Sequence, residues 1–348
     1  MTKYIVRRTL WFLPVLFAVT LFTFVLMRAI PGGPFSYAGD KSLPPQVVAN
    51  IEAKYHLDWP MWKQFASYLL GDDIVDRAAY EESLALKRRP SRGLIRGDLG
   101  PSFRYRGQTV NDIVATTLPT SAQLGLMAVA LALVIGIPAG TIAALKQNSA
   151  IDYMATFSAV FFASIPSVVL SPILIYVFAL RLNWFPVASW GTKPPYFLGF
   201  LPQLAHLNLT FLKHAALPVF ALGTGMAAGI ARLTRGSLLQ VIREDYIRTA
   251  RAKGLKERLI IVRHALKNSM IPVATILGPL IAAVVTGTFI VEQIFGINGM
   301  GKHFVQSIGN RDYPVIIGVT LIYSVLLVIG NLMVDITYAW LDPRIRYD

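Results

Sequence analysis

The chain has 348 residues, of which 54% are hydrophobic and only 15% are charged, and its formal net charge is +14. Soluble globular domains carry about 25% charged residues, so this composition excludes an ordinary soluble protein and indicates a membrane protein. The absence of cysteine excludes disulfides, thiolate metal sites and cysteine nucleophiles.

Long windows without Lys, Arg, Asp or Glu recur along the chain, and each is long enough, or nearly so, to cross a bilayer. About 20 apolar residues span the hydrocarbon core, where backbone polar groups must be satisfied within a helix. We therefore expect six membrane-spanning helices: Thr9–Met27, Ile113–Leu145, Tyr153–Leu180, His214–Ala231, Asn268–Val291 and Tyr313–Val334.

Two windows need a separate interpretation. The first follows basic residues, as in a signal peptide, but it exceeds the h-region length of about 7–15 residues, so we expect a retained helix. A seventh window, Pro194–Leu212, contains three prolines and several polar residues. We expect it to be an interfacial or re-entrant piece of an outer loop.

The distribution of Lys and Arg predicts the orientation. With both termini in the cytoplasm, 16 of these residues lie inside and 5 lie in the two short outer loops. The first outer segment holds 12 more, but long loops are largely exempt from the positive-inside bias. We therefore expect cytoplasmic termini, and a basic surface that faces anionic lipid rather than nucleic acid.

The predicted outer segment, residues 31–112, is polar and mixed in charge. Pro44–Tyr55 and Met61–Leu70 have the pattern of helices. The highly charged stretch Asp72–Arg96 is expected to form an exposed helix with a flexible end.

The six windows themselves contain no Asp, Glu, Lys or Arg. Intramembrane charges mark proton relays and many ion pathways, so if the protein moves a solute, we expect the energy to enter from outside the membrane. Gly136–Gly140 and Gly225–Gly229 are G-x-x-x-G pairs that permit close helix approach. The windows also contain weakly polar residues, which could line a substrate pathway or simply pack between helices. These residues are Gln123, Ser164, Ser167, Thr224, Thr286 and Thr288.

The stretch Arg232–Lys267 is far longer than a simple helix connection, which needs about 2–8 residues. It shows helical periodicity in two pieces separated by Gly254, which stands where a helix C-cap would be. The first apolar face comprises Leu238, Leu239, Ile242, Tyr246 and Ala250, and the second comprises Leu255, Leu259, Val262 and Leu266. Two such helices could lie on the membrane surface or present a short helix to a partner protein.

The sequence from Glu244 to Gly254, EDYIRTARAKG, followed by RHALKN at Arg263–Asn268 and by Ile271-Pro272, resembles the signature loop of binding-protein-dependent ABC importer permeases. Arg248 and Thr249 replace the Glu and Ala of the general motif, as in the dipeptide and oligopeptide branch. Other stretches agree with that branch: Tyr4–Arg8, Pro31-Gly32, Gly97–Gly100, Arg311–Pro314 and Leu341–Tyr347. The resemblance covers nearly the whole chain except about Asp72–Arg96.

The resemblance implies an all-α membrane protein with six transmembrane helices and the type I importer permease (MetI-like) fold. The implied organisation is a first helix in residues 1–30, an extracytoplasmic insertion in 31–112, a five-helix core in 113–340 with a coupling loop in 232–267, and a cytoplasmic tail in 341–348. It implies a bacterial or archaeal cell membrane and a transport subunit without a catalytic site, cofactor or metal.

The implied partners are a second permease, two ATPase subunits that hydrolyse ATP, and an extracytoplasmic binding protein. In the family the first helix of the loop docks in a groove of the ATPase, with Ile242, Tyr246 and Ala250 as apolar anchors. The coupling residues carried over are Ile242, Glu244, Asp245, Tyr246, Arg248, Ala250, Arg251, Lys253 and Gly254. The cargo would be di- or oligopeptides, with nickel chelates or oligosaccharides as alternatives, and a secondary transporter is the less favoured mechanism.

The segment Gly296–His303 has the spacing of a P-loop, but His303 stands where Ser or Thr must hold magnesium. It also follows a predicted membrane helix rather than a strand. We therefore expect a glycine-rich outer turn that leads to the sixth span.

Overall fold

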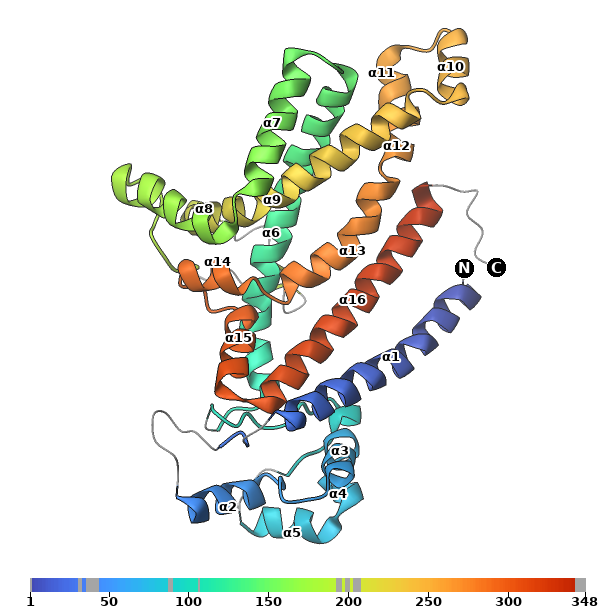
Figure 1. Ribbon diagram of the computed structural model, residues 1–348. Helices are drawn as coiled ribbons and strands as arrows, with labels where there is room; N and C mark the ends of the chain where they lie inside the picture. The colour runs from blue at the N-terminus through green and yellow to red at the C-terminus, as the bar shows by residue number, and fades with distance from the viewer. Residues whose placement is uncertain are drawn as a thin grey trace. The chain divides into compact units, whose positions relative to one another are not determined.

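The computed structural model describes residues 2–30, 33–35, 44–86, 90–105, 107–191, 196–197, 201–202 and 208–341 (Figure 1). The elements of the N-terminal part are α1 (Thr2–Ala29), α2 (Pro45–Lys54), α3 (Met61–Leu70), α4 (Asp72–Val75), α5 (Arg77–Ala85) and a 3₁₀ turn (Leu94–Arg96). The middle part holds α6 (Val110–Leu145), α7 (Ala150–Ser164), α8 (Ser167–Leu174), a π-helical segment (Ile175–Arg181), β1 (Tyr196–Phe197), β2 (Leu201–Pro202) and α9 (Leu209–Val241). The rest holds α10 (Asp245–Ala252), α11 (Glu257–Leu259), a π-helical turn (Ile260–Ala265), α12 (Leu266–Ser269), α13 (Ile271–Val285), α14 (Phe289–Ile294), α15 (Met300–Asn310) and α16 (Tyr313–Leu341).

Five segments in the described part of the chain are long and apolar enough to cross a membrane. They are Val6–Ala29, Val110–Leu145, Leu209–Val241, Ile271–Ile294 and Tyr313–Tyr338. Each contains, or overlaps almost completely, one of the windows predicted from the sequence. The mostly helical fold expected from the sequence is therefore confirmed, although every helix extends beyond its charge-free window.

The expected third span, Tyr153–Leu180, is not one straight helix. α7 and α8 meet at a bend of 99°, so they form either one broken span or a re-entrant segment (Figure 1). Pro166 precedes α8 with φ −59° and ψ 140°, and Ile165 before it is extended. A residue before proline is driven out of the α region, so the Ile165-Pro166 step ends α7 and sets the start of α8.

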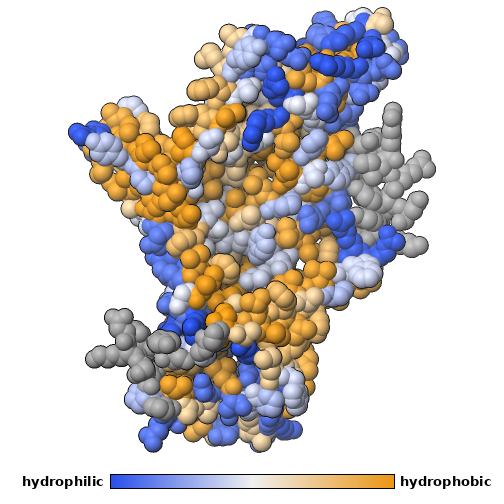
Figure 2. Space-filling model, viewed as in Figure 1, coloured by the Kyte–Doolittle hydropathy of each residue, from blue (hydrophilic) through white to orange (hydrophobic). Residues whose placement is uncertain are grey.

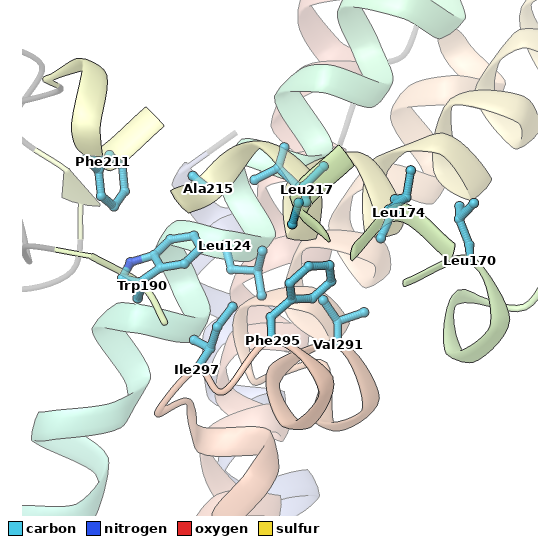
Figure 3. Packing of buried hydrophobic residues seen from close by; sticks show 13 residues of the cluster. Leu124, Leu170, Leu174, Trp190, Phe211, Ala215, Leu217, Val291, Phe295 and Ile297 are labelled. Atoms are coloured by element: carbon cyan, nitrogen blue, oxygen red, sulfur yellow. The ribbon is translucent and has the colours of Figure 1, made fainter. Parts of the chain in front are cut away.

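The chain divides into two compact units, and α1, α6 and α16 each contribute residues to both. The first unit comprises residues 1–8, 118–299 and 326–348. Its largest apolar cluster draws residues from α6, α8, α9 and α14 and from the loop that carries Trp190 (Figure 3). Phe211 and Trp190 meet edge to face with ring centroids 5.3 Å apart, so the start of α9 is fixed against the segment that precedes it.

The two G-x-x-x-G pairs have different surroundings. A Cβ on Gly136 would lie 2.7 Å from the carbonyl oxygen of Ala227, and one on Gly140 would lie 2.4 Å from that of Ala231. Gly225 and Gly229 have open space at the same position. The first pair therefore lets α6 approach the backbone of α9, whereas the second pair has no packing role among the described residues.

The second unit comprises residues 9–117 and 300–325. The two helices predicted from Pro44–Tyr55 and Met61–Leu70 are confirmed as α2 and α3. The expectation of one exposed helix over Asp72–Arg96 is wrong. The stretch contains α4, α5 and a 3₁₀ turn, and Asp72 is buried, where it accepts hydrogen bonds from the Ser67 hydroxyl and, at 2.8 Å, from the Ser91 amide.

Asp312 ties the start of α16 to the loop before α6. Its buried carboxylate accepts hydrogen bonds from the Ser102 hydroxyl at 2.5 Å and from the backbone amides of Phe103 at 3.0 Å and Arg104 at 3.3 Å. A buried carboxylate satisfied by three donors avoids the desolvation penalty of an isolated charge. The acidic residue of the Arg311–Pro314 stretch therefore stabilises the second unit.

Most of the seventh window, Pro194–Leu212, and the tail from 342 onward lie outside the described residues. Of that window, the structure describes the pair β1 and β2 and the first turn of α9. Asn208 caps α9 by accepting a hydrogen bond from the Phe211 amide at 2.8 Å. Leu209–Leu212 therefore begin α9 rather than belonging to a separate loop.

Candidate functional site

The segment from Arg232 to Lys267 is a folded extension of the first unit. α9 continues to Val241, so the apolar part of the helix and the basic part are one helix. The chain then turns over Ile242–Glu244 and starts α10, which has Asp245 in its first turn and Arg251 in its last. These charges complement the partial charges of the helix ends. Gly254 follows α10 with φ +73°, which confirms its predicted place as a left-handed helix stop.

The first amphipathic helix predicted from Leu238 to Ala250 is two helices. The turn at Ile242–Glu244 changes the helical phase, so Ile247 is fully buried while Tyr246 stays 42% exposed. Ala250 is also buried, in a cluster with Ala144, Leu238, Ile260 and Ala265. Ala250 thus faces the protein's own core, and the interpretation of this residue as an anchor for a partner is wrong.

The second predicted helix also differs in its face. Over Glu257–Ser269 the chain forms α11, a π-helical turn and α12. The one extra residue per turn of π-helix shifts the pattern, so Ile260 and Ala265 are buried while Leu259 and Val262 are exposed. The apolar face expected from Leu255, Leu259 and Val262 therefore lies on the surface.

Two polar contacts connect the two halves of this loop. Asn268 donates from Nδ2 to the Tyr246 hydroxyl at 2.8 Å, joining α10 to α12. Arg251 forms two hydrogen bonds with Glu257, at 2.7 and 3.2 Å. These bonds lower the pKa of Glu257 and raise the pKa of Arg251, as expected when each charged form gains a partner.

An ion pair holds the base of the loop. Arg235 on α9 donates from Nε to Asp152 Oδ1 at 2.6 Å and from Nη2 to Oδ2 at 2.7 Å. The Asp152 side chain on α7 is only 2% exposed and also accepts from the Asn148 amide. A bidentate arginine–carboxylate pair fixes relative orientation, so the extension of α9 that carries α10 is locked to α7.

The remaining residues predicted for coupling lie on the outside of the loop. Glu244, Asp245, Tyr246, Arg248, Arg251, Lys253 and Gly254 are exposed, and Ile242 is partly buried. Figure 2 shows a largely hydrophilic surface over α10 and α11. The exposed face of α10 thus offers charge and one aromatic ring to a partner, while its buried face rests on α9 and the π-helical turn.

The sequence windows missed a carboxylate inside the apolar part of the first unit. Glu292 on α14 is fully buried within the span Ile271–Ile294. Its Oε1 accepts from the Ser121 hydroxyl of α6 at 2.7 Å and from the Thr288 amide at 3.0 Å. A Cβ on Gly299 would lie 2.3 Å from its carboxyl carbon. The signal in the sequence was an acidic residue directly after an apolar window, followed by a glycine-rich turn.

The weakly polar residues of the predicted set do not form one lining. Gln123 accepts from Trp190 Nε1 at 2.9 Å, and Thr286 bonds its own helix backbone. Ser164 is exposed. The hydroxyls of Thr224 and Thr288 are buried without a hydrogen-bond partner in the described parts of the chain. These placements assign no substrate pathway.

Comparison with protein families gives two matches that together cover nearly the whole chain. Residues 136–347 match the family described as "Binding-protein-dependent transport system inner membrane component", and residues 1–125 match its N-terminal companion. The chain belongs to this family. It is thus a multi-pass inner-membrane subunit of a transport system, and the resemblance seen in the Glu244–Gly254 loop is confirmed at the level of the family.

Individual relatives of this transport family align along the entire chain. The oligopeptide transport system permease protein OppB of Salmonella typhimurium is 42% identical over 347 residues, covering 100% of both chains. The dipeptide transport system permease protein DppB of Bacillus subtilis is 41% identical over 99% of this chain and 98% of its own. A solved structure of the MetNI methionine ABC transporter in inward-facing conformations has a TM-score of 0.43 at 16% identity, over 65% of this chain and 96% of that one.

Proposed function

We propose that this chain is the membrane-spanning subunit of an ATP-driven importer that takes up di- or oligopeptides. The observation that carries the proposal is full-length identity of about 40% to relatives whose names specify oligopeptide or dipeptide transport. The importer would need a second permease, two ATPase subunits and a binding protein that delivers the peptide. ATP hydrolysis belongs to the ATPase subunits, and this chain supplies the moving pathway.

The loop at 232–267 is the proposed contact with an ATPase subunit. Its exposed residues Glu244, Asp245, Tyr246 and Arg248 would meet the partner, while Ile247 and Ala250 hold α10 against the chain. Two connections would transmit a movement of α10 to the rest of the chain. The Tyr246–Asn268 hydrogen bond connects α10 to α12, which precedes α13. The Arg235–Asp152 pair connects α9, which precedes α10, to α7. The proposed contact with the ATPase subunit also includes the residues at the two ends of α10, which are Ile242, Arg251, Lys253 and Gly254.

The excess of Lys and Arg in short segments supports placing both termini and this loop in the cytoplasm, where the ATPase subunits bind ATP. In the same orientation, residues 31–112 are an extracytoplasmic insertion before the core at 113–340. The tail at 341–348 would then end in the cytoplasm.

The coupling role is tested with variants on the exposed face of α10 and at the glycine that follows it. Arg248→Ala changes a side chain that is 72% exposed and whose ion pair, with Asp245 at 3.5 Å, is weak. Gly254→Pro demands φ near −65° where the chain has +73°. Both variants, and Tyr246→Ala, are expected to reduce ATPase co-purification and uptake. Arg77→Ala, whose side chain is 85% exposed on α5, is the matched control. Survival of both activities in Tyr246→Ala and Gly254→Pro would refute the coupling role.

The cargo is tested by reconstituting the importer in proteoliposomes with its binding protein. A peptide panel should stimulate both uptake and ATP hydrolysis. Stimulation by a nickel chelate or an oligosaccharide alone would replace the peptide assignment but keep the importer. Uptake that follows a proton gradient without ATP would instead show a secondary transporter.

A further inference from the structure

The second unit contains a cavity of about 350 Å³. It lies among the end of α1, helices α2 and α3, the loop before α6 and the start of α16. Its walls mix apolar and polar groups and include Phe24, Arg28, Tyr68, Asp72, Tyr313 and Ile317.

Arg28 places a positive charge on this cavity, and no carboxylate among the described residues pairs with it. Its guanidinium lies 3.4 Å from the centroid of the Phe24 ring, and its Nε donates to Gln64 Oε1 at 2.8 Å. Within the described ranges it forms no ion pair. A partly buried cation that lacks a counterion is costly, so an anionic ligand would be favoured here.

Gln64 fixes the direction in which Arg28 points. Its Nε2 donates to two backbone carbonyls, those of Leu57 at 3.0 Å and Trp59 at 2.7 Å. The amide group therefore cannot rotate without losing both bonds, and its oxygen stays turned to Arg28. The remaining donors of the guanidinium are preorganised for a ligand, which reduces the ordering cost of binding.

Tyr68 supplies a second donor. Tyr68 lines the cavity. Its hydroxyl is buried and has no hydrogen-bond partner in the described part of the chain. Burial raises the pKa of this hydroxyl, so it is protonated at neutral pH and can donate. Buried polar groups are normally satisfied, and each exception requires an explanation.

The other charged groups on the wall leave room for an anion. Asp72 is already satisfied by the Ser67 hydroxyl and the Ser91 amide. Lys54 also lines the cavity, with its ammonium 5.1 Å from the centroid of the Tyr55 ring. The cavity therefore combines two cations, one satisfied carboxylate and one unsatisfied donor.

We propose that this cavity binds the phosphate of a phospholipid headgroup, with Arg28 and Tyr68 as donors. The location favours a lipid because Phe24 and Arg28 end the apolar segment Val6–Ala29, and Tyr313 and Ile317 begin the apolar segment Tyr313–Tyr338. Groups at the ends of membrane-spanning segments lie at headgroup level. Water occupies about 30 Å³ per molecule in the liquid, so the volume suits a headgroup rather than a single ion.

The test measures phospholipid binding to the purified full-length chain in detergent by native mass spectrometry. Phosphatidylglycerol and phosphatidylethanolamine are the lipid probes, glycerol 3-phosphate is the soluble phosphate probe, and a tripeptide is the competing ligand class. Wild-type protein should retain one lipid more tightly than the rest. Tyr68→Phe keeps the ring and removes only the hydroxyl, and it should weaken that lipid about tenfold, as expected for a hydrogen bond to a charged group. Arg28→Gln should weaken it at least as much.

Stability provides a second readout that a purely structural tyrosine would not give. In delipidated protein the Tyr68 hydroxyl is an unsatisfied buried group, so Tyr68→Phe should leave the melting temperature unchanged or raise it. With added lipid the same variant should gain less stability than wild type. Tyr80→Phe, outside the cavity, is the matched control and should respond to lipid as wild type does.

Equal lipid retention by wild type, Tyr68→Phe and Arg28→Gln would overturn the proposal. So would binding of glycerol 3-phosphate or the tripeptide that depends on Tyr68 while lipid retention does not, because the cavity would then hold a soluble anion. The proposal does not depend on peptide transport, and its failure would leave the coupling loop untouched.

Discussion

Replacement of Asp152 by alanine would leave the guanidinium of Arg235 without its carboxylate. The pair is bidentate, with nitrogen–oxygen distances of 2.6 and 2.7 Å, and the two side chains are 2% and 30% exposed. Breaking a buried pair by removing one partner costs about 3–5 kcal/mol. Because Arg235 keeps some contact with solvent, we expect the lower end of that range, about 3 kcal/mol of unfolding free energy.

The measurement is a double-mutant cycle of Asp152→Ala and Arg235→Ala, with unfolding followed in detergent micelles. The double variant should be less destabilised than the sum of the single variants, because the second substitution removes the charge that the first left without its carboxylate. Arg232→Ala is the matched control on the same helix, since Arg232 is exposed, and it should change stability by less than about 0.5 kcal/mol.

A coupling energy near zero, or a loss in Asp152→Ala as small as that of Arg232→Ala, would refute this account of the pair. The same variants also address transmission through the loop. If the pair holds the extension of α9 in place, Asp152→Ala at a permissive temperature should lower uptake per ATP hydrolysed, whereas Arg232→Ala should not.

Two further predictions concern the first unit. Gly278→Ala should cost about 1–3 kcal/mol, the range for overpacking, because the new Cβ would lie 2.6 Å from the carbonyl oxygen of Gly330; Gly229→Ala, which faces open space, should cost nothing in the same thermal unfolding assay. The second prediction concerns Glu257, whose pKa is lowered by the hydrogen bonds from Arg251. The pair therefore stabilises the loop at neutral pH. This stabilisation is lost as the pH falls below the usual glutamate pKa of about 4.3 and through the lowered pKa of Glu257. The exposed pair should contribute about 0.2–1 kcal/mol, and Glu257→Gln should abolish that part of the pH dependence of loop protection in hydrogen exchange.

The membrane-spanning segments were predictable because their signal is local and large. A run of some 20 residues without charge leaves few alternatives to a helix, and the described helices contain or overlap every predicted window. The break at Ile165-Pro166 was visible in the sequence as a proline but not as a bend of 99°. Prolines are tolerated inside membrane helices, as Pro138 and Pro218 show in α6 and α9, so the residue alone does not decide between a kink and a break.

The coupling loop shows why helical periodicity failed to assign the correct face. Both predicted faces assumed a constant 3.6-residue repeat. The turn at Ile242–Glu244 and the π-helical turn Ile260–Ala265 change the phase. Ile247 and Ile260 then replace Tyr246 and Leu259 as the buried residues. Phase changes depend on packing against α9, which a single sequence does not reveal.

Glu292 bears on the question of how transport is driven. The argument against a proton-driven transporter rested on charge-free windows, and this carboxylate lies one residue beyond the fifth window, inside the described span. Its placement nevertheless matches a structural role. The Ser121 hydroxyl and the Thr288 amide donate hydrogen bonds to it. Gly299 packs so closely against the carboxyl group that a Cβ there would overlap it. A carboxylate enclosed in this way holds α14 to α6 and to the glycine-rich turn. A proton relay would instead require access to water and a partner that exchanges the proton. The buried carboxylate therefore does not support a proton-driven mechanism, and it is consistent with our proposal that the energy for transport enters through the loop at 232–267.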